Sequence, residues 1–133
     1  MREIKFRAWD KQIKEMLSVD KIEWDRKLVY IRSSTRDHME TPRRISEDIC
    51  CLMQYTGLND KNGKEIYEGD IVEYFKRRYF IKFHLANFML SKKESNFLGL
   101  NSAIYSQDGV LTVIGNIHKN PKLLKGAKYI LKE

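Results

Sequence analysis

Three glycines at intervals of six residues, Gly57, Gly63 and Gly69, divide residues 52–72 into short runs in which apolar and polar side chains alternate. Glycine supplies the positive φ that tight turns require, and alternation with a period of two is typical of β-strands. Asn62-Gly63 predicts a two-residue hairpin in which both central residues take positive φ. Asp70 follows the last glycine, and we expect its carboxylate to accept hydrogen bonds from nearby backbone amides. The segment therefore predicts a tightly folded β element.

The first third of the chain has the pattern of a small antiparallel sheet. Residues 2–9 alternate between charged and apolar side chains, as in a half-buried strand. Residues 16–19 and 28–31 are further strand candidates, and Asp25-Arg26-Lys27 predicts the turn between them. The polar stretch 33–48 follows, with one short helical turn after Thr41-Pro42, where proline suits the first helical position.

The second part of the chain predicts a compact barrel. The apolar run 49–55 has strand length, and residues 79–90 predict two strands that meet at Ala86-Asn87. Residues 91–105 have no clear period and predict a loop with a helical turn. Residues 110–118 predict a final strand that closes the barrel, with a bulge or bend at Gly115. The predicted organisation is a β meander with a polar loop at 1–48, a barrel at 49–121 and a basic tail at 122–133.

Composition limits the class of protein. Apolar residues make up 42% and charged residues 32% of the 133 residues, as expected for an ordered soluble chain. The longest apolar run is too short to span a bilayer, and the opening alternation of charged and apolar residues differs from a signal peptide. We therefore expect a cytoplasmic protein without a membrane partner.

No motif in the chain points to catalysis or to a cofactor. The histidines have no nucleophile at a recognisable spacing, and the glycine-rich segment lacks the Lys-Ser or Lys-Thr ending of a phosphate loop. Cys50 and Cys51 are adjacent, which disfavours a disulfide, and no further ligand stands at metal-binding spacing. The sequence predicts a protein that is not an enzyme and that holds no metal or cofactor.

Three blocks of this sequence together resemble the YopX family of phage and prophage proteins, and the likeness runs from end to end. The blocks are Arg2-Glu-Ile-Lys-Phe-Arg-Ala-Trp-Asp10, Gln54-Tyr-Thr-Gly-Leu-Asn-Asp-Lys-Asn-Gly-Lys-Glu-Ile-Tyr-Glu-Gly-Asp-Ile-Val72 and Val113-Ile-Gly-Asn-Ile-His-Lys-Asn-Pro121. The resemblance implies a mainly β fold, in which a small N-terminal antiparallel sheet is followed by an SH3-type β-barrel. It also implies a phage or prophage of a low-GC Gram-positive host, and it carries over no site residues. Two departures from the family are the basic, apolar stretch 76–90 and the tail beyond Pro121.

Net charge gives the clearest pointer to a partner. The formal charge is +7, and most of the excess lies in the second half of the chain, which favours polyanions. Basic residues and an aromatic ring at the start of a strand are the ingredients with which small β-barrels bind nucleic acid. The candidate polyanion-binding residues are Lys76, Arg77, Arg78, Tyr79, Lys82, Lys92 and Lys93.

Two functions therefore stand side by side. The first is an interaction module that forms a homo-oligomer or binds a host or phage protein, because the apolar run 79–90 would invite aggregation if it formed a bare edge. The alternative is a nucleic-acid-binding barrel that uses the basic hairpin. A third interpretation gives this hairpin no function: residues 76–78 form a solvated tip, and Tyr79 and Phe80 turn into the core.

Overall fold

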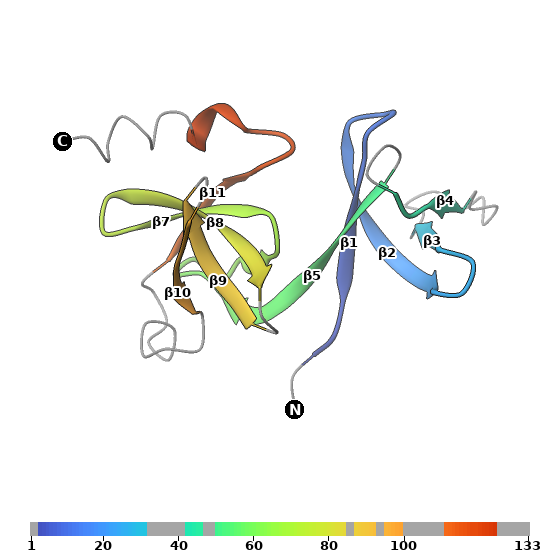
Figure 1. Ribbon diagram of the computed structural model, residues 1–133, viewed down its shortest axis with the longest axis horizontal. Helices are drawn as coiled ribbons and strands as arrows, with labels where there is room; N and C mark the ends of the chain where they lie inside the picture. The colour runs from blue at the N-terminus through green and yellow to red at the C-terminus, as the bar shows by residue number, and fades with distance from the viewer. Residues whose placement is uncertain are drawn as a thin grey trace. The chain divides into compact units, whose positions relative to one another are not determined.

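The computed structural model describes residues 3–31, 42–46, 50–84, 87–92, 95–99 and 111–124. These residues are mainly β, with strands in two antiparallel sheets and one short helical turn at 122–124 (Figure 1). The chain forms two compact units that divide between Gln54 and Tyr55. The sequence predicts a division at 48/49, just before strand β5 (Cys50–Asn59), and the two units of the structure divide inside that strand. Among the described residues, no helix is long and apolar enough to cross a membrane.

In the N-terminal unit strands β1 to β4 pair in sequence, and β5 pairs with the other side of β1. Its strand order is β4-β3-β2-β1-β5, and all of these pairs are antiparallel. The predicted strands at 16–19 and 28–31 and the turn at 25–27 are confirmed, whereas the strand predicted at 2–9 begins only at Phe6. The strands are β1 (Phe6–Asp10), β2 (Glu15–Glu23), β3 (Leu28–Ile31), β4 (Arg43–Arg44) and the first half of β5.

The core of this unit forms around four side chains that the structure buries, Ala8, Val29, Ile31 and Cys50. Asp10 ends β1 as a buried carboxylate, accepting hydrogen bonds from Arg43 Nε at 2.7 Å and from the amides of Gln12 and Ile13. Buried charge is tolerated when it is paired in this way. The pair therefore ties the end of β1 to β4.

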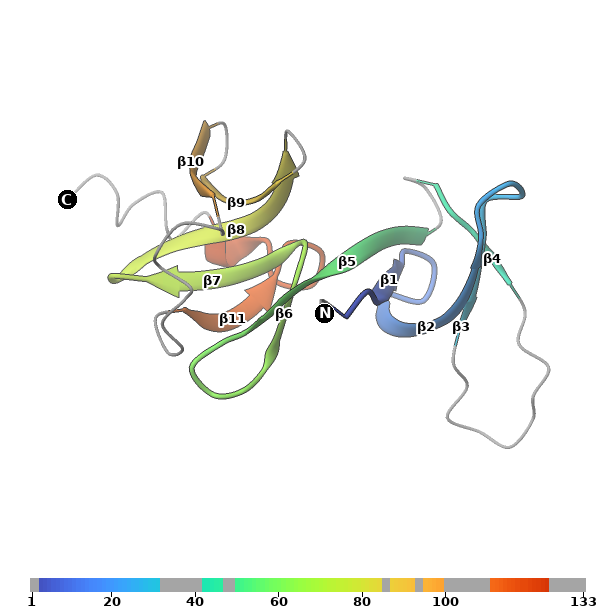
Figure 2. The same ribbon diagram turned by 90° about the horizontal axis from the view of Figure 1, so that it is seen from below.

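The second unit is built on a meander. Strands β7 to β10 pair in sequence, and β11 returns to the other side of β7, which gives the order β10-β9-β8-β7-β11 (Figure 2). Among the described strands no ladder joins β10 to β11. The remaining part of β5 pairs with β6. The strands are β6 (Glu65–Tyr67), β7 (Asp70–Tyr74), β8 (Arg77–His84), β9 (Asn87–Lys92), β10 (Ser95–Gly99) and β11 (Thr112–Asn116).

Alternation along β8 and β9 fills the core of the second unit. Tyr79 and Ile81 from β8 and Phe88 and Leu90 from β9 are buried, together with Ile66, Val72 and Leu111. The predicted pair of strands within 79–90 is confirmed. Both strands lie inside the sheet, so the apolar run finds its partners within the chain and does not form an exposed edge.

Three sequence expectations are wrong. Residues 91–105 were expected to form a loop, but β9 continues to Lys92 and β10 follows, with a register shift between Asn96 and Leu98 that breaks the period-two signal. Arg43–Arg44 are extended where the helical turn was expected, because they pair with β3. Gln107-Asp108-Gly109, which in the sequence is a further hairpin signal, lies outside the described residues.

The third correction concerns the turn at Asn62-Gly63. Only Gly63 takes positive φ, and its amide donates to the carbonyl of Asp60, while the Asp60 amide donates to the carbonyl of Lys64. The loop therefore has three residues and ends in a left-handed glycine, which is the next commonest hairpin geometry after the predicted two-residue loop. The chain reversal itself is confirmed.

Candidate functional site

The basic hairpin joins β7 to β8 through a two-residue loop. Tyr74 and Arg77 are the last pair of the ladder, and Phe75 and Lys76 between them take φ values of 48° and 62°. Two positive φ values are the mark of a type I′ turn, whose twist matches that of the strands. Phe75 is 77% exposed, and Lys76 and Arg77 are exposed as well. We call Phe75, Lys76 and Arg77 the hairpin tip; it points away from the sheet at the left of Figures 1 and 2.

The structure separates the other predicted binding residues on β8. Tyr79 is only 8% exposed and belongs to the core, so its ring is not available for stacking. Arg78 is half-buried, and its Nη1 donates to the carbonyl oxygen of Leu123 at 3.1 Å. Lys82 is exposed farther along the strand. Of the basic residues on this strand, Arg78 thus holds the C-terminal segment, while Arg77 and Lys82 face solvent.

The two remaining candidates cannot be placed in a surface. Lys92 is the last residue of β9, where only its backbone is described, and Lys93 lies outside the described residues. The residue that sequence analysis missed is Phe75, whose ring centroid lies 4.4 Å from that of Tyr74. The available signal was an aromatic residue next to Lys76 at a strand junction, but without a Gly or Asn the turn could not be located.

The residues of the glycine-rich block are occupied with holding the backbone. Asp60 is 5% exposed, and its carboxylate accepts three amide hydrogen bonds: from Asn62 at 2.8 Å, from Lys64 at 2.9 Å and from Val113 at 3.0 Å. The Lys61 amide adds a bond to the carbonyl of Leu111. Asp60 therefore shapes its own hairpin and also fastens that hairpin to β11.

The following turn is held in the same manner. Asp70 is buried and accepts from the amide of Tyr67 at 2.8 Å, which confirms the expected role of this carboxylate. The Thr56 hydroxyl donates to the carbonyl of Ile66 at 2.7 Å. These side chains, like Asp60, stabilise turns and strand contacts.

Residues 116–120 form the turn that follows β11. Asn116 Oδ1 accepts from the amides of His118 and Lys119, and Asn120 Oδ1 accepts from the amide of Asn116 at 3.2 Å. Val113 and Asn116 thus both donate their amides to side chains, Asp60 and Asn120. A strand whose amides are occupied in this way is protected against pairing with a foreign strand.

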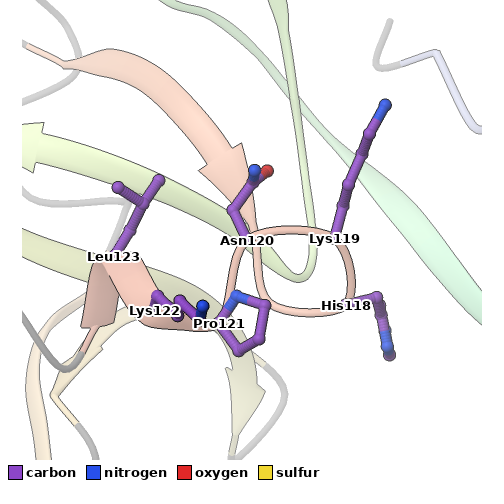
Figure 3. A pocket seen from close by; sticks show the side chains of 6 residues that line it. All are labelled: His118, Lys119, Asn120, Pro121, Lys122 and Leu123. Atoms are coloured by element: carbon purple, nitrogen blue, oxygen red, sulfur yellow. The ribbon is translucent and has the colours of Figure 1, made fainter.

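A cavity of about 480 Å³ lies at the loop that follows β11, lined by residues 118–123. In Figure 3 the side chains of His118 and Lys119 leave the loop in opposite directions, and Pro121 contributes an apolar wall. A small-molecule site needs a few polar groups that converge on one point. This cavity does not have them.

Cys50 does not have the environment of a reactive thiol. Burial raises the pKa of the Cys50 thiol to about 11, and the neighbouring Asp10 charge acts in the same direction. A protonated, buried thiol is a poor nucleophile. Within the described part of the chain no group of three or more His, Cys, Asp or Glu side chains could hold a metal ion.

We call the three hydrogen bonds that the Asp60 carboxylate accepts the Asp60 clip. This clip makes the free energy of unfolding depend on pH. Burial alone would raise the pKa of Asp60, but the bonds from the Val113, Lys64 and Asn62 amides outweigh it and hold the pKa below its ordinary value of 3.8. A lowered pKa in the folded state contributes stability above the unfolded value, and that contribution is lost as pH falls through the folded value. Urea unfolding between about pH 6 and pH 3 should therefore show the wild type losing more stability than Asp60→Asn below about pH 4. Parallel curves would contradict the role given to this carboxylate.

Comparisons with known proteins agree with the fold described above. The model of the family described as YopX protein matches residues 5–125. A crystal structure of protein EF1440 from Enterococcus faecalis superposes with a TM-score of 0.61 at 34% sequence identity, covering 93% of this chain and 99% of that one. A comparison with curated proteins finds no match. With a family match over nearly its whole length, the chain belongs to the YopX family.

Proposed function

We propose that this YopX protein is a non-enzymatic interaction module of a phage or prophage that works in the host cytoplasm. We further propose that its second unit is an SH3-type barrel. Two features support the barrel: the meander β7 to β10 with β11 returning to β7, and the Asp60 clip that joins the β5–β6 hairpin to β11. A scaffold of this kind carries its binding residues on loops and hairpin tips.

The observation that carries the proposal is the hairpin tip. It combines a largely exposed aromatic ring with two exposed cations, whereas Thr56, Asp60 and Asp70 of the glycine-rich block hold turns. Exposed aromatic rings and arginine are enriched where proteins meet partners, and the charge selects a negatively charged one. The partner surface is therefore the tip, and the partner is acidic.

The sequence argument for self-association used the apolar run 79–90, which the structure places inside the sheet. A homo-oligomer thus needs a different surface from the one expected. The alternative partner, a nucleic acid, is favoured by the exposed Lys76 and Arg77 beside an aromatic ring.

Retention on a heparin column tests the proposal, because heparin is a generic polyanion. We expect Lys76→Gln/Arg77→Gln to elute at clearly lower salt than Lys61→Gln/Lys64→Gln, although the two variants have the same net charge. Lys61 and Lys64 are exposed on the β5–β6 hairpin of the same unit, which makes the second variant a matched control. Equal elution would overturn the choice of the hairpin tip.

Light scattering after size-exclusion chromatography, in low and in high salt, separates the kinds of partner. Nucleic acid that purifies with the protein and is stripped by salt supports polyanion binding, since phosphate contacts release counterions. An oligomer that survives high salt would instead assign the partner surface to a second copy of this chain.

A further inference from the structure

The turn residue Phe75 is unfavourable in two respects. Its φ of 48° lies in the left-handed region, where glycine and asparagine are at ease and a bulky aromatic residue is strained. Its side chain is 77% exposed and so gains little from burial. An exposed ring held at a strained position contributes little to the fold, and such outliers cluster at functional sites.

Neighbouring aromatic side chains restrict the position of the Phe75 ring. The Phe75 ring centroid lies 4.4 Å from that of Tyr74 with the planes at 55°, and the Tyr74 ring packs in turn against buried Tyr79 at 6.3 Å. The ring is therefore braced on one side by its own hairpin, while most of its surface is open to solvent. Such bracing reduces the entropy that binding would cost.

The charged side chains of the turn and of the adjoining ladder pair are both positive. Lys76 follows Phe75 in the turn, and Arg77 stands opposite Tyr74 in the ladder. Lys76 and Arg77 are both exposed. The hairpin strands described carry two acidic residues: Asp70 is buried, and Glu73 is exposed and stands opposite Arg78, one step farther from the turn. The tip itself thus presents an aromatic ring followed by two exposed cations, and no carboxylate lies in the turn.

We infer that the hairpin tip binds single-stranded nucleic acid, with one unpaired base stacked on Phe75 and the flanking phosphates paired with Lys76 and Arg77. This inference rests on the proposed function and names its partner. A folded protein partner needs a contact area several times larger than one ring on a narrow turn provides. A single base matches the ring in size and brings a phosphate on each side, whereas in a duplex the base faces are covered by their neighbours.

The turn between β2 and β3 also exposes an aromatic ring, and it serves as a comparison for the hairpin tip. Trp24, the residue after β2, is 63% exposed, but its ring packs edge-on against Phe6, and Glu23 pairs with Lys21 at 3.3 Å and with Arg26 at 3.2 Å. It presents an aromatic ring whose neighbouring Lys21 and Arg26 are paired with a carboxylate. Trp24→Ala is therefore a matched control for loss of an exposed ring.

The decisive variant is Phe75→Asn, since asparagine is at home in this turn and lacks the ring. We expect it to fold and to melt at the same temperature as the wild type or above. Its affinity for a fluorescent oligothymidine of about fifteen nucleotides, measured by anisotropy, should fall about tenfold or more, as for loss of one stacked base. Trp24→Ala should bind like the wild type.

An abasic oligonucleotide of the same length separates stacking from charge. The wild type should bind it about as weakly as Phe75→Asn binds oligothymidine. In Lys76→Gln/Arg77→Gln, the slope of log affinity against log salt concentration should decrease in magnitude by about 1.4, because two phosphate contacts are lost. Equal affinity for both oligonucleotides, or undiminished binding by Phe75→Asn, would overturn the inference. Heparin retention that still depends on Lys76 and Arg77 would then leave the proposed function standing with another acidic partner.

Discussion

Asp60→Ala is expected to lower the free energy of unfolding by about 3 kcal/mol, because it leaves three amides without their acceptor. Asn62 and Lys64 donate to one oxygen of this carboxylate, and Val113, far along the chain, donates to the other. The substitution thus opens the β5–β6 loop and releases β11 together. Urea unfolding near pH 7, followed by circular dichroism, measures the loss.

Two further variants make the test specific. Asp60→Asn should be intermediate, with a cost of about 1–2 kcal/mol, because its oxygen can serve Asn62 and Lys64 while its amide faces the amide of Val113. Asp25→Ala, in an exposed turn, should stay within about 0.5 kcal/mol of the wild type. If Asp60→Ala were no more costly than Asp25→Ala, the clip would not hold the second unit together.

Gly115→Ala should destabilise the chain by about 1–3 kcal/mol, although glycine here has no unusual φ to provide. A Cβ at this position would lie 2.6 Å from Asn120 Oδ1 and 2.9 Å from Leu123 Cδ1. Asn120 would have to move, and its Oδ1 accepts the hydrogen bond from Asn116. The cost is therefore overpacking together with loss of a bond at the end of β11, and thermal unfolding measures it.

A double-mutant cycle identifies the source of this cost. Asn120→Ala removes the atom nearest to the added methyl group. Gly115→Ala should therefore cost less free energy of unfolding in the Asn120→Ala background than in the wild type. Strict additivity would show that Leu123, or the backbone, carries the strain. The site was visible in the sequence as a glycine inside a β-branched strand, but its neighbour five residues later was not.

The sequence predicts strands well where side chains alternate and turns well where glycine is required. It located β1, β3 and the β8–β9 pair, because burial on one face leaves a period of two. It missed β10, where the register shift between Asn96 and Leu98 moves apolar residues out of phase. Local patterns cannot reveal a strand whose regularity is interrupted by its partner.

The candidate site was found only in part for a similar reason. The charges of Lys76 and Arg77 are plain in the sequence, yet the aromatic residue beside them depends on where the chain turns. With the turn at Phe75-Lys76, Tyr79 falls on the buried face of β8 and Phe75 becomes exposed. A shift of the turn by one residue would exchange the two faces of the strand.

Strand β5 belongs to both units, and this affects how the chain folds during translation. Its residues 50–54 pair with β1, and its later residues Tyr55 and Asn59 pair with β6. During translation, β1 gains its second neighbour only when the segment that begins the next unit is leaving the ribosome. The N-terminal sheet of a nascent chain therefore waits, with one side of β1 open, for synthesis to pass into the second unit.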